Sequence, residues 1–513
     1  MTAPGRLLED APGDAELAWL RRSGFSEPER AGRELRQLAA LPRVLGALRP
    51  RLGSLLRTFA LMPDATGALV RLERFAHQDA GATLAALLER GTQAQEALLW
   101  ALGGSAFTGE QVIGHPEWAE WLTRPRVLSR STRVRAVAAE ARELVAGRGR
   151  EEARDALRRL RRRELLRIAV RDLMRLATVT ETLTALSALA DGLVEVALEV
   201  AARELSDHGT SAAGASTAGF AVLALGKLGG GELNFSSDVD LVYVHRGGPG
   251  AGAIADGHAQ ALGRHLTAVL GETTPEGHVY RVDLRLRPEG RAGSISHSVA
   301  ATSEYYLRRG ASWERLALLK ARPVAGDRAL AREVLRRASA FVWRRPFGAD
   351  AVEDVLRHKQ ENDRRLAARQ LETRHVKLGR GGIREIELVV QVLQIRAGGR
   401  LRNPRARATL AALDGLRAAG ALTAPQARAL ARAYVFLRDV ENKLQMAHDT
   451  QTHVLPDDAG GLELLAARLG YRRGGDGAKA VLRLRADLDA HRSEVRRLYE
   501  AVLGRLVRSG SAP

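Results

Sequence analysis

Two aspartates separated by one residue, Asp238 and Asp240, open an apolar segment that follows a glycine-rich stretch. If this segment is a β-strand, both side chains point to the same face, because successive side chains alternate. Two neighbouring carboxylates repel each other, and a divalent cation between them removes that cost. Oxygen ligands suit Mg²⁺, which also binds phosphate oxygens. The pair therefore predicts a Mg²⁺ site for chemistry at phosphorus.

The glycine-rich stretch reads GKLGGG over residues 226–231. Glycines let the backbone approach a phosphate closely and offer N–H donors to it, and the two serines before Asp238 add hydroxyl donors. The predicted phosphate-binding residues are Gly226, Lys227, Gly229, Gly230, Ser236 and Ser237. The stretch is not a P-loop, because Lys227 follows the first glycine instead of closing the loop.

A third aspartate lies in the segment VYRVDLRLR at 279–287, whose alternation predicts another strand. One face would carry Val282, Leu284 and Leu286, and the other Asp283, Arg285 and Arg287. Three carboxylates can hold two cations that bind the attacking and leaving oxygens of a displacement at phosphorus. The two arginines can neutralise phosphate charge with paired N–H donors. A lone D-x-D is usually a solvated pair, but the glycine stretch, the apolar strand and the third acid together favour a nucleotidyltransferase.

The sequence patterns around these residues predict an α+β protein that is mostly helical. The predicted regions are an N-terminal helical region (1–205), a nucleotidyltransferase α/β domain (206–345) and a C-terminal helical domain (346–513). A small, polar stretch at 206–219 marks the first boundary as a loop. Within the middle region the patterns predict strands at 220–226, 238–245 and 279–287, and a helix at 258–270.

Residues 151–177 show an apolar stripe of leucines, alanines and a valine, and arginines spaced four apart follow another face, which predicts an amphipathic helix. Thr178 and Glu181 fit a capping box for the next helix. The net charge is 79 − 60 = +19, but the arginines are spread along helices without interleaved aromatics. We therefore expect solvated helix faces and consider nucleic-acid binding unlikely.

No apolar leader is seen at the N-terminus, and the most apolar stretch, around 183–202, carries Asp191, Glu195 and Glu199 at helical spacing. A bilayer does not tolerate such charges, so no membrane span is expected. The chain contains no cysteine, which excludes disulfides and thiol catalysis and fits a cytoplasmic location.

Several ordered blocks between about 150 and 460 resemble the glutamine synthetase adenylyltransferase/adenylyl-removing family. They are GFAVLALGKLGGGELNFSSDVDLVYVH, YRVDLRLRPEGRAG, the EYY…WER…KAR block at 304–327, VKLGRGGIREIELVVQVLQIRAGG at 376–399 and FLRDVENKLQMAHDTQTHVLP at 436–456. These motifs are similar to the N-terminal, adenylyl-removing half of the family. Trp313-Glu314-Arg315 matches that half, whereas the attaching half has a different tryptophan-containing motif at this place.

The resemblance implies a polymerase-beta-like nucleotidyltransferase domain followed by a uridylyltransferase-like helical bundle. It implies Mg²⁺ on Asp238, Asp240 and Asp283, glutamine synthetase in adenylylated or unmodified form as the protein substrate, and ATP, ADP and phosphate as small substrates. The PII signal protein is a further implied partner. The implied reaction is phosphorolytic removal of AMP from adenylyl-tyrosine. Alternatives are ATP-dependent attachment, a non-catalytic regulatory half, and an RNA nucleotidyltransferase favoured only by charge.

Four further residues are expected to support the site: Lys320, Arg322, Arg384 and Glu385. The resemblance places the first two near the nucleotide, although their pattern alone also fits a solvated helix face. Arg384, Glu385 and Glu387 follow a glycine run at 379–382, which could open a helix as an anion site or be an ordinary helix start. Trp313 and Trp343 are expected in the core.

Overall fold

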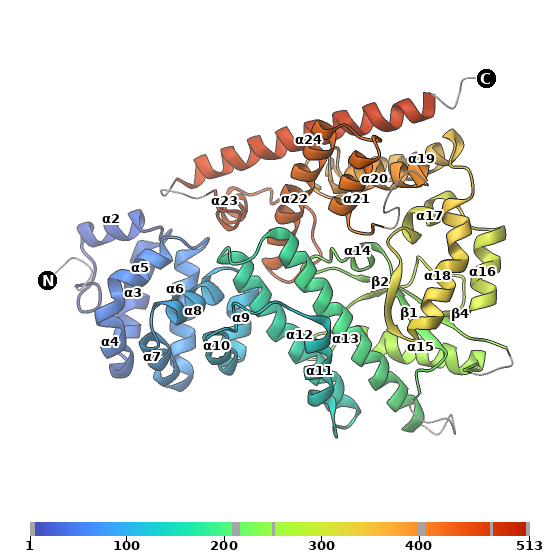
Figure 1. Cartoon of the computed structure of the whole chain (residues 1–513). Helices are drawn as coiled ribbons and strands as arrows, with labels where there is room; N and C mark the ends of the chain where they lie inside the picture. Colours follow the sequence, from blue (N-terminus) through green and yellow to red (C-terminus); the bar gives the residue numbers. More distant parts are fainter. Residues whose placement is uncertain (1–5, 208–215, 249–251, 399–405, 472–475, 509–513) are drawn as a thin grey trace. The chain divides into compact units, whose positions relative to one another are not determined.

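The computed structural model describes residues 6–207, 216–248, 252–398, 406–471 and 476–508. The chain forms two compact units (Figure 1). The first contains Met1–Ser131, Arg162–Thr182 and Asp439–Asp489, and the second contains Thr132–Arg161, Leu183–Arg438 and Ala490–Pro513. The division into three consecutive domains stays a prediction, because each unit is assembled from separate segments.

The first unit is helical. Its N-terminal helices are α2 (Asp14–Arg22), α3 (Pro28–Ala39), α4 (Pro42–Leu48), α5 (Leu52–Phe59), α6 (Ala65–Ala76), α7 (Ala82–Glu89), α8 (Thr92–Gly103), α9 (Ala106–Gly114) and α10 (Pro116–Leu122). Short 3₁₀ turns at Arg49–Arg51 and His77–Asp79 connect some of them, and α23 (Ala459–Arg468) also belongs to this unit. Leucine and alanine make up most of the core, as the low aromatic content predicts.

The amphipathic helix predicted at 151–177 is α12 (Arg150–Leu173). Its apolar stripe is buried as predicted, but the helix ends before Ala177 because Arg175 adopts a left-handed φ of 59°. The arginine face is not solvated throughout: Arg167 is 1% exposed and donates to Glu164 at 2.9 Å. A buried guanidinium needs such a partner, and the sequence pattern did not reveal it.

The predicted capping box between Thr178 and Glu181 is confirmed at the start of α13 (Val179–Asp207). The Thr178 N–H donates to the Glu181 carboxylate at 2.7 Å, and the Glu181 N–H donates to the Thr178 hydroxyl at 3.2 Å. The two bonds satisfy donors that a helix N-terminus otherwise leaves open. The predicted loop at 206–219 falls largely on 208–215, outside the described residues.

The second unit contains a five-stranded mixed sheet in the order β3–β2–β1–β5, with β4 also paired to β2. Its strands are β1 (Phe220–Ala224), β2 (Val239–His245), β3 (Val282–Asp283), β4 (Ser296–Ser298) and β5 (Arg322–Gly326). Strand β1 pairs antiparallel with β2 and β5, whereas β3 and β4 pair parallel with β2. The strands predicted at 220–226 and 238–245 are β1 and β2.

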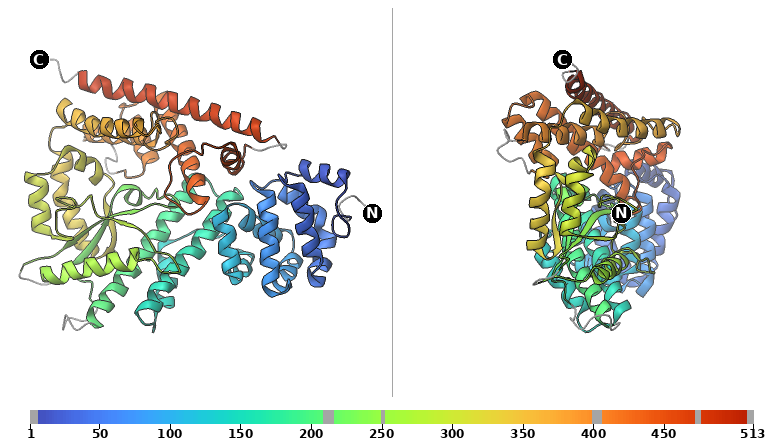
Figure 2. Two further views of the ribbon diagram at one scale, coloured as in Figure 1. Left: turned by 180° about the vertical axis from the view of Figure 1, so that it is seen from behind. Right: turned by 90° about the vertical axis from the view of Figure 1, so that its right-hand side faces the viewer.

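Helices cover both faces of this sheet (Figures 1 and 2). Val242 and Val244 share a buried cluster with Leu330 and Val334 of α18 (Arg328–Trp343). Tyr243, which points to the opposite face, donates to or accepts from Thr267 at 3.1 Å in α15 (Asp256–Gly271), the helix predicted at 258–270. By the same alternation Asp240 lies on the α18 side of the sheet.

The remaining helices of the second unit complete a mostly helical α+β fold, as predicted. They are α11 (Val134–Val145), α14 (Gly226–Gly230), α16 (Val299–Arg308), α17 (Ser312–Leu318), α19 (Ala349–Ala367), α20 (Ile383–Ala397) and α21 (Thr409–Ala418). Two long helices, α22 (Ala424–Met446) and α24 (Gly477–Arg508), contribute residues to both units. Among the described helices, none combines the length and apolar composition that a bilayer crossing requires.

The strand predicted over 279–287 is wrong beyond Asp283. β3 contains two residues, and the chain then turns, with the Arg287 N–H donating to the Leu284 carbonyl at 3.2 Å. The following Pro288 and the left-handed Glu289, with φ at 62°, fit a turn and not a strand. Consequently Arg285 and Arg287 do not share one strand face with Asp283.

Candidate active site

The glycine-rich stretch forms the short helix α14 directly after β1 and not an open loop. Gly226 has a φ of 54°, and a Cβ atom at this position would lie 2.0 Å from the Asp240 Oδ2 atom. Both the left-handed backbone and the close approach therefore require glycine. The Leu225 N–H donates to the Asp240 carbonyl at 2.9 Å, so the start of the helix is fixed against the strand that carries the acid.

Arg322 holds the other end of this helix. Its guanidinium donates to the carbonyls of Leu228 at 2.8 Å and Gly229 at 3.2 Å, and it forms two 2.8 Å hydrogen bonds with Asp191 of α13. Arginine at the carbonyl end of a helix satisfies acceptors that have no partner within it. Arg322 opens β5, so the alternative of a solvated helix face is wrong, and the side chain positions α14.

Asp240 and Asp283 face each other across the parallel pairing of β2 and β3, where they are register partners. Burial, and next the neighbouring Asp283 carboxylate, raise the pKa of Asp240 to about 6; the positive charges of Lys377 and Lys227 oppose this shift. The structure thus brings Asp283 beside Asp240, as a set of carboxylates requires, while metal binding by this set stays a prediction.

Arginines contact the carboxylates of Asp238 and Asp283. Arg281 donates through Nε to Asp238 at 2.7 Å, and Arg285 donates through both its backbone N–H, at 2.8 Å, and its guanidinium to Asp283. Burial opposes the charged form of Asp283, but these hydrogen bonds from Arg285 hold the pKa of that carboxyl below its usual value. Arg285 was predicted to bind phosphate and instead contacts a predicted metal ligand.

Three other predicted phosphate ligands lie elsewhere. The Arg287 guanidinium donates to the carbonyls of Gly293, Ser294 and Leu284, so it stabilises the turn after β3. Ser236 is buried and its carbonyl accepts from Arg281 at 3.3 Å. Ser237 is partly buried, and neither serine is among the residues that line the cavity beside Asp240.

A cavity of about 270 Å³ opens beside Asp240 and α14. Basic side chains on its wall are Lys227, Lys320, Lys377 and Arg384, and its apolar wall includes Trp313, Leu316 and Ala317 of α17. A cavity lined by both cations and an aromatic ring suits a phosphate joined to a flat base. Trp313 was expected in the core and instead lines this cavity.

Lys320 stands at the centre of a buried ionic cluster on the cavity wall. Its Nζ contacts Glu232 Oε2 at 3.0 Å, Glu387 Oε1 at 3.4 Å and Thr409 Oγ1 at 3.4 Å. Burial disfavours the charge on Lys320, but the two carboxylates outweigh it and raise its pKa. For Glu387, burial is likewise outweighed, by Lys320 first, and its pKa falls to about 2. Both groups are charged at neutral pH, so the cluster links the segment that follows α14 to α20 and α21.

Glu385 and Glu387 belong to α20 but point to different places. Glu385 is fully buried and pairs with Lys359 at 3.2 Å and Arg496 at 2.9 Å, whereas Glu387 lines the cavity beside Arg384. Both glutamates are buried, although the helix start alone gives no sign of this. Glu385 supports the helical layer, and Glu387 is the residue of this pair that the cavity contains.

The glycine run before α20 does not offer a set of open amides. The N–H groups here donate within the chain. Gly381 donates to Glu385 at 3.0 Å, and the first two residues of α20 also donate, Ile383 to Val376 at 3.1 Å and Arg384 to Lys377 at 2.9 Å. The anion site considered at this helix start is thus not supported. The tight packing explains the glycine, since a Cβ at Gly381 would lie 2.0 Å from the Arg492 carbonyl oxygen.

Sequence reasoning missed Arg281, Glu232 and Lys377. Each is a single charged residue with no repeated spacing, and Glu232 is separated by 88 residues from its partner Lys320. The only available signal was proximity in sequence to quoted motifs, because Glu232 follows the glycine stretch and Lys377 opens the KLGRGG block.

The sheet, the glycine helix and the carboxylates on β2 and β3 define a domain of the nucleotidyltransferase class. Comparison with known families agrees: residues 95–337 match the glutamate-ammonia ligase adenylyltransferase family, and residues 351–503 match the GlnD PII-uridylyltransferase family. The match over residues 95–337 confirms the resemblance to this family that the motifs in that range carry.

Individual relatives carry the same description, bifunctional glutamine synthetase adenylyltransferase/adenylyl-removing enzyme. The protein of Stenotrophomonas maltophilia (strain K279a) is 45% identical over 302 residues, which is 58% of this chain and 32% of the relative. That of Xanthobacter autotrophicus is 38% identical over 442 residues, 82% of this chain and 44% of the relative. The chain thus spans about a third to under a half of the length of these relatives.

Proposed function

We propose that this chain transfers the adenylyl group carried by a tyrosine of glutamine synthetase, and that it works in the direction of removal. In this reaction an oxygen of inorganic phosphate attacks the phosphorus of adenylyl-tyrosine. The bond from phosphorus to the tyrosine oxygen breaks, and the products are ADP and unmodified glutamine synthetase. The observation that carries the proposal is that Asp240 pairs with Asp283, packs against Gly226 and lines a cavity with basic walls.

Each group of the cavity has a place in this chemistry. Lys227 and Lys377 line the same cavity as Asp240, so their charges can hold a phosphate anion beside the acid. Trp313 and Leu316 offer an apolar wall for the adenine ring. Lys320 is paired to Glu232 and Glu387, so we assign it to positioning the wall and not to a substrate.

The residues fit Mg²⁺ by donor type. Asp238, just before β2, Asp240 on β2 and Asp283 on β3 are hard oxygen donors, and burial together with the Asp283 charge raises the pKa of Asp240, a cost that a bound cation would offset. As the side chains stand, no group of three His, Asp or Glu residues in the described chain converges on one point. Arg281 and Arg285 occupy Asp238 and Asp283, so holding the ion requires these side chains to turn. Bound Mg²⁺ would stabilise negative charge on the phosphoryl oxygens and the departing phenolate.

The direction of transfer rests on the motif resemblance to the adenylyl-removing half, and attachment from ATP is the second candidate. An assay with two arms separates them. In one arm the protein meets adenylylated glutamine synthetase, Mg²⁺ and phosphate, and in the other it meets unmodified glutamine synthetase, Mg²⁺ and ATP. We expect ADP in the first arm and no labelling in the second. Labelling from ATP without ADP in the first arm would reverse the assignment.

A non-catalytic regulatory half is the third candidate. It would show neither reaction while still binding glutamine synthetase. The intact set of Asp238, Asp240 and Asp283 favours catalysis over this reading. An RNA nucleotidyltransferase would instead bind RNA with a steep dependence on salt, which a binding titration at two salt concentrations tests.

A further inference from the structure

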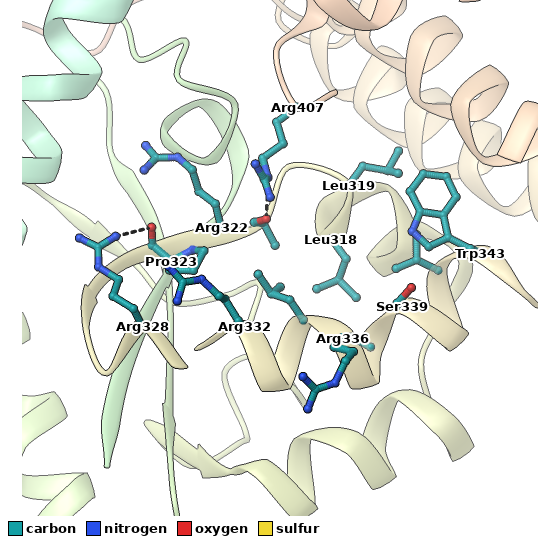
Figure 3. A pocket seen from close by; sticks show the side chains of 14 residues that line it. Leu318, Leu319, Arg322, Pro323, Arg328, Arg332, Arg336, Ser339, Trp343 and Arg407 are labelled. Carbon is teal, nitrogen blue, oxygen red and sulfur yellow. Dashed lines mark hydrogen bonds between the residues drawn. The ribbon is translucent and has the colours of Figure 1, made fainter. Parts of the chain in front are cut away.

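A second and larger cavity of about 630 Å³ lies in the same unit, between α18, β5 and the segment that joins α17 to β5 (Figure 3). We call it the arginine cavity after the arginines that line it: Arg322, Arg328, Arg332, Arg336 and Arg407. It shares no lining residue with the cavity beside Asp240. Leu316 and Lys320 line the cavity beside Asp240, whereas Leu318, Leu319 and Arg322 line the arginine cavity.

Two of these arginines have no carboxylate partner among the described residues. Arg332 and Arg336 lie one helical turn apart on α18, and both are exposed. Neither side chain has a hydrogen bond or an ion pair with another described residue. Like charges at this spacing destabilise a helix. The arginines on α12 differ, since Arg158 has Asp155 at 2.7 Å and Arg167 has Glu164 at 2.9 Å. The unpaired guanidinium groups on α18 therefore fit an anion supplied from outside.

The other three arginines add to the positive potential. Arg328 donates to the Pro323 carbonyl at 3.1 Å and to Glu195 at 3.2 Å, and Arg407 donates to the Ala321 carbonyl at 3.0 Å. Arg322 is matched by Asp191. Asp191 contacts Arg322 and Glu195 contacts Arg328, whereas no carboxylate of the described residues contacts Arg332 or Arg336. A concave surface with this imbalance concentrates anions.

The opposite end of the cavity is apolar. Trp343 is partly buried, not in the core as expected from the sequence, and it lines the cavity with Leu318, Leu319 and Val342. In Figure 3 the tryptophan ring lies at one side, Arg328 and Arg332 lie at the other, and Leu318 and Arg336 lie between them. A ligand that fills the cavity therefore needs an anionic end and a flat apolar end.

We propose that the arginine cavity binds a nucleoside phosphate as a site separate from the catalytic one. The phosphates would lie on Arg332 and Arg336, because guanidinium groups bind phosphate through paired N–H donors. The base would lie on Trp343, whose ring supplies an apolar face. The volume is within the range of small-molecule sites, about 300–1,000 Å³. An acidic peptide matches these features less well, because it would place charge, not a ring, against the tryptophan end.

Calorimetric titration of ADP into the whole chain, in EDTA, tests the site. The double variant Arg332→Glu/Arg336→Glu reverses the two unpaired charges, and Arg337→Glu on the same helix is the control, since Arg337 does not line the cavity and pairs with Glu333. We expect the double variant to bind ADP at one site fewer than the wild type, or at least tenfold more weakly at that site, and the control to match the wild type. Counting sites separates this outcome from binding in the catalytic cavity. Equal stoichiometry and affinity for the wild type and the folded double variant would overturn the proposal.

Trp343→Leu tests the nucleoside part separately. We expect it to weaken ADP at this site and to leave inorganic tripolyphosphate unchanged, because tripolyphosphate has no ring. If Trp343→Leu leaves ADP affinity unchanged, the cavity does not recognise a nucleoside. Thermal melts of each variant check that loss of binding does not reflect unfolding.

Discussion

Asp240 lies directly opposite Asp283 across the parallel strands β2 and β3, and Gly226 approaches the Asp240 carboxylate so closely that a Cβ atom would lie 2.0 Å from it. This relationship joins the two sequence motifs, the glycine stretch and the acids, into one site. Because the Gly226 backbone and the Asp240 carboxylate are in close contact, a change at either residue displaces the other.

Gly226→Ala should abolish activity, whereas Gly231→Ala should retain most of it. Both glycines have left-handed φ angles, 54° and 71°, so each alanine costs about 1–2 kcal/mol of backbone strain. Only the alanine at 226 collides with Asp240, since a Cβ at 231 meets no atom within 4 Å. Turnover and urea unfolding of the two variants measure this. Equal activity of the two variants would contradict the role given to the close approach.

Glu387→Gln should destabilise the protein by about 3 kcal/mol at neutral pH, because it leaves Lys320 with one carboxylate fewer. The pKa of Glu387 is lowered from 4.5 in the unfolded chain to about 2 in the folded one. Its stabilisation is therefore complete above pH 4.5 and is lost as the pH falls toward 2. Urea unfolding should show a constant difference from wild type between pH 7 and 5 that shrinks below 4.5. The exposed Glu361→Gln serves as control, and a difference that does not shrink in acid would argue against a charged Glu387.

Arg322→Lys should lower kcat/KM about tenfold and stability by about 1–3 kcal/mol. Lysine cannot reproduce the two hydrogen bonds to Asp191 together with those to the Leu228 and Gly229 carbonyls. The glycine helix then loses its fixed position beside Asp240. Arg344→Lys, at an exposed position of the same unit, should be neutral. Unchanged kinetics in Arg322→Lys would mean that α14 needs no such support.

Much of the site could be predicted from sequence, and the reasons are local. Asp238 and Asp240 stand in an apolar run that forms β2, and Asp283 is paired to it, because alternation and burial are properties of short segments. The errors have two causes. Arg285 contacts Asp283, two residues away, because β3 ends there, and Arg167 is buried with Glu164 one helical turn away; the sequence pattern shows neither where the strand ends nor that this part of the arginine face is buried. Glu387 pairs with Lys320, 67 residues away in the sequence, and periodicity carries no signal for such a long-range partner.

Mg²⁺ should raise the melting temperature of the wild type by a few degrees, since ligand at ten times its Kd stabilises by about 1.4 kcal/mol. Asp240→Asn should remove this shift, because it removes the central oxygen donor. In EDTA the same variant should melt slightly higher than the wild type, since it relieves the repulsion from Asp283. Asp414→Asn, exposed on α21, should respond to Mg²⁺ as the wild type does. An unchanged Mg²⁺ response in Asp240→Asn would exclude this carboxylate as a ligand.

The most direct test of the proposed chemistry is the release of ADP from adenylylated glutamine synthetase by wild-type chain and by Asp240→Asn, with phosphate and Mg²⁺ present. We predict one ADP per adenylyl-tyrosine removed by the wild type and by the Asp414→Asn control, and a rate at least about a hundredfold lower for Asp240→Asn. Wild-type rates from a folded Asp240→Asn, in this direction or in the reverse one, would contradict the assignment of the carboxylates.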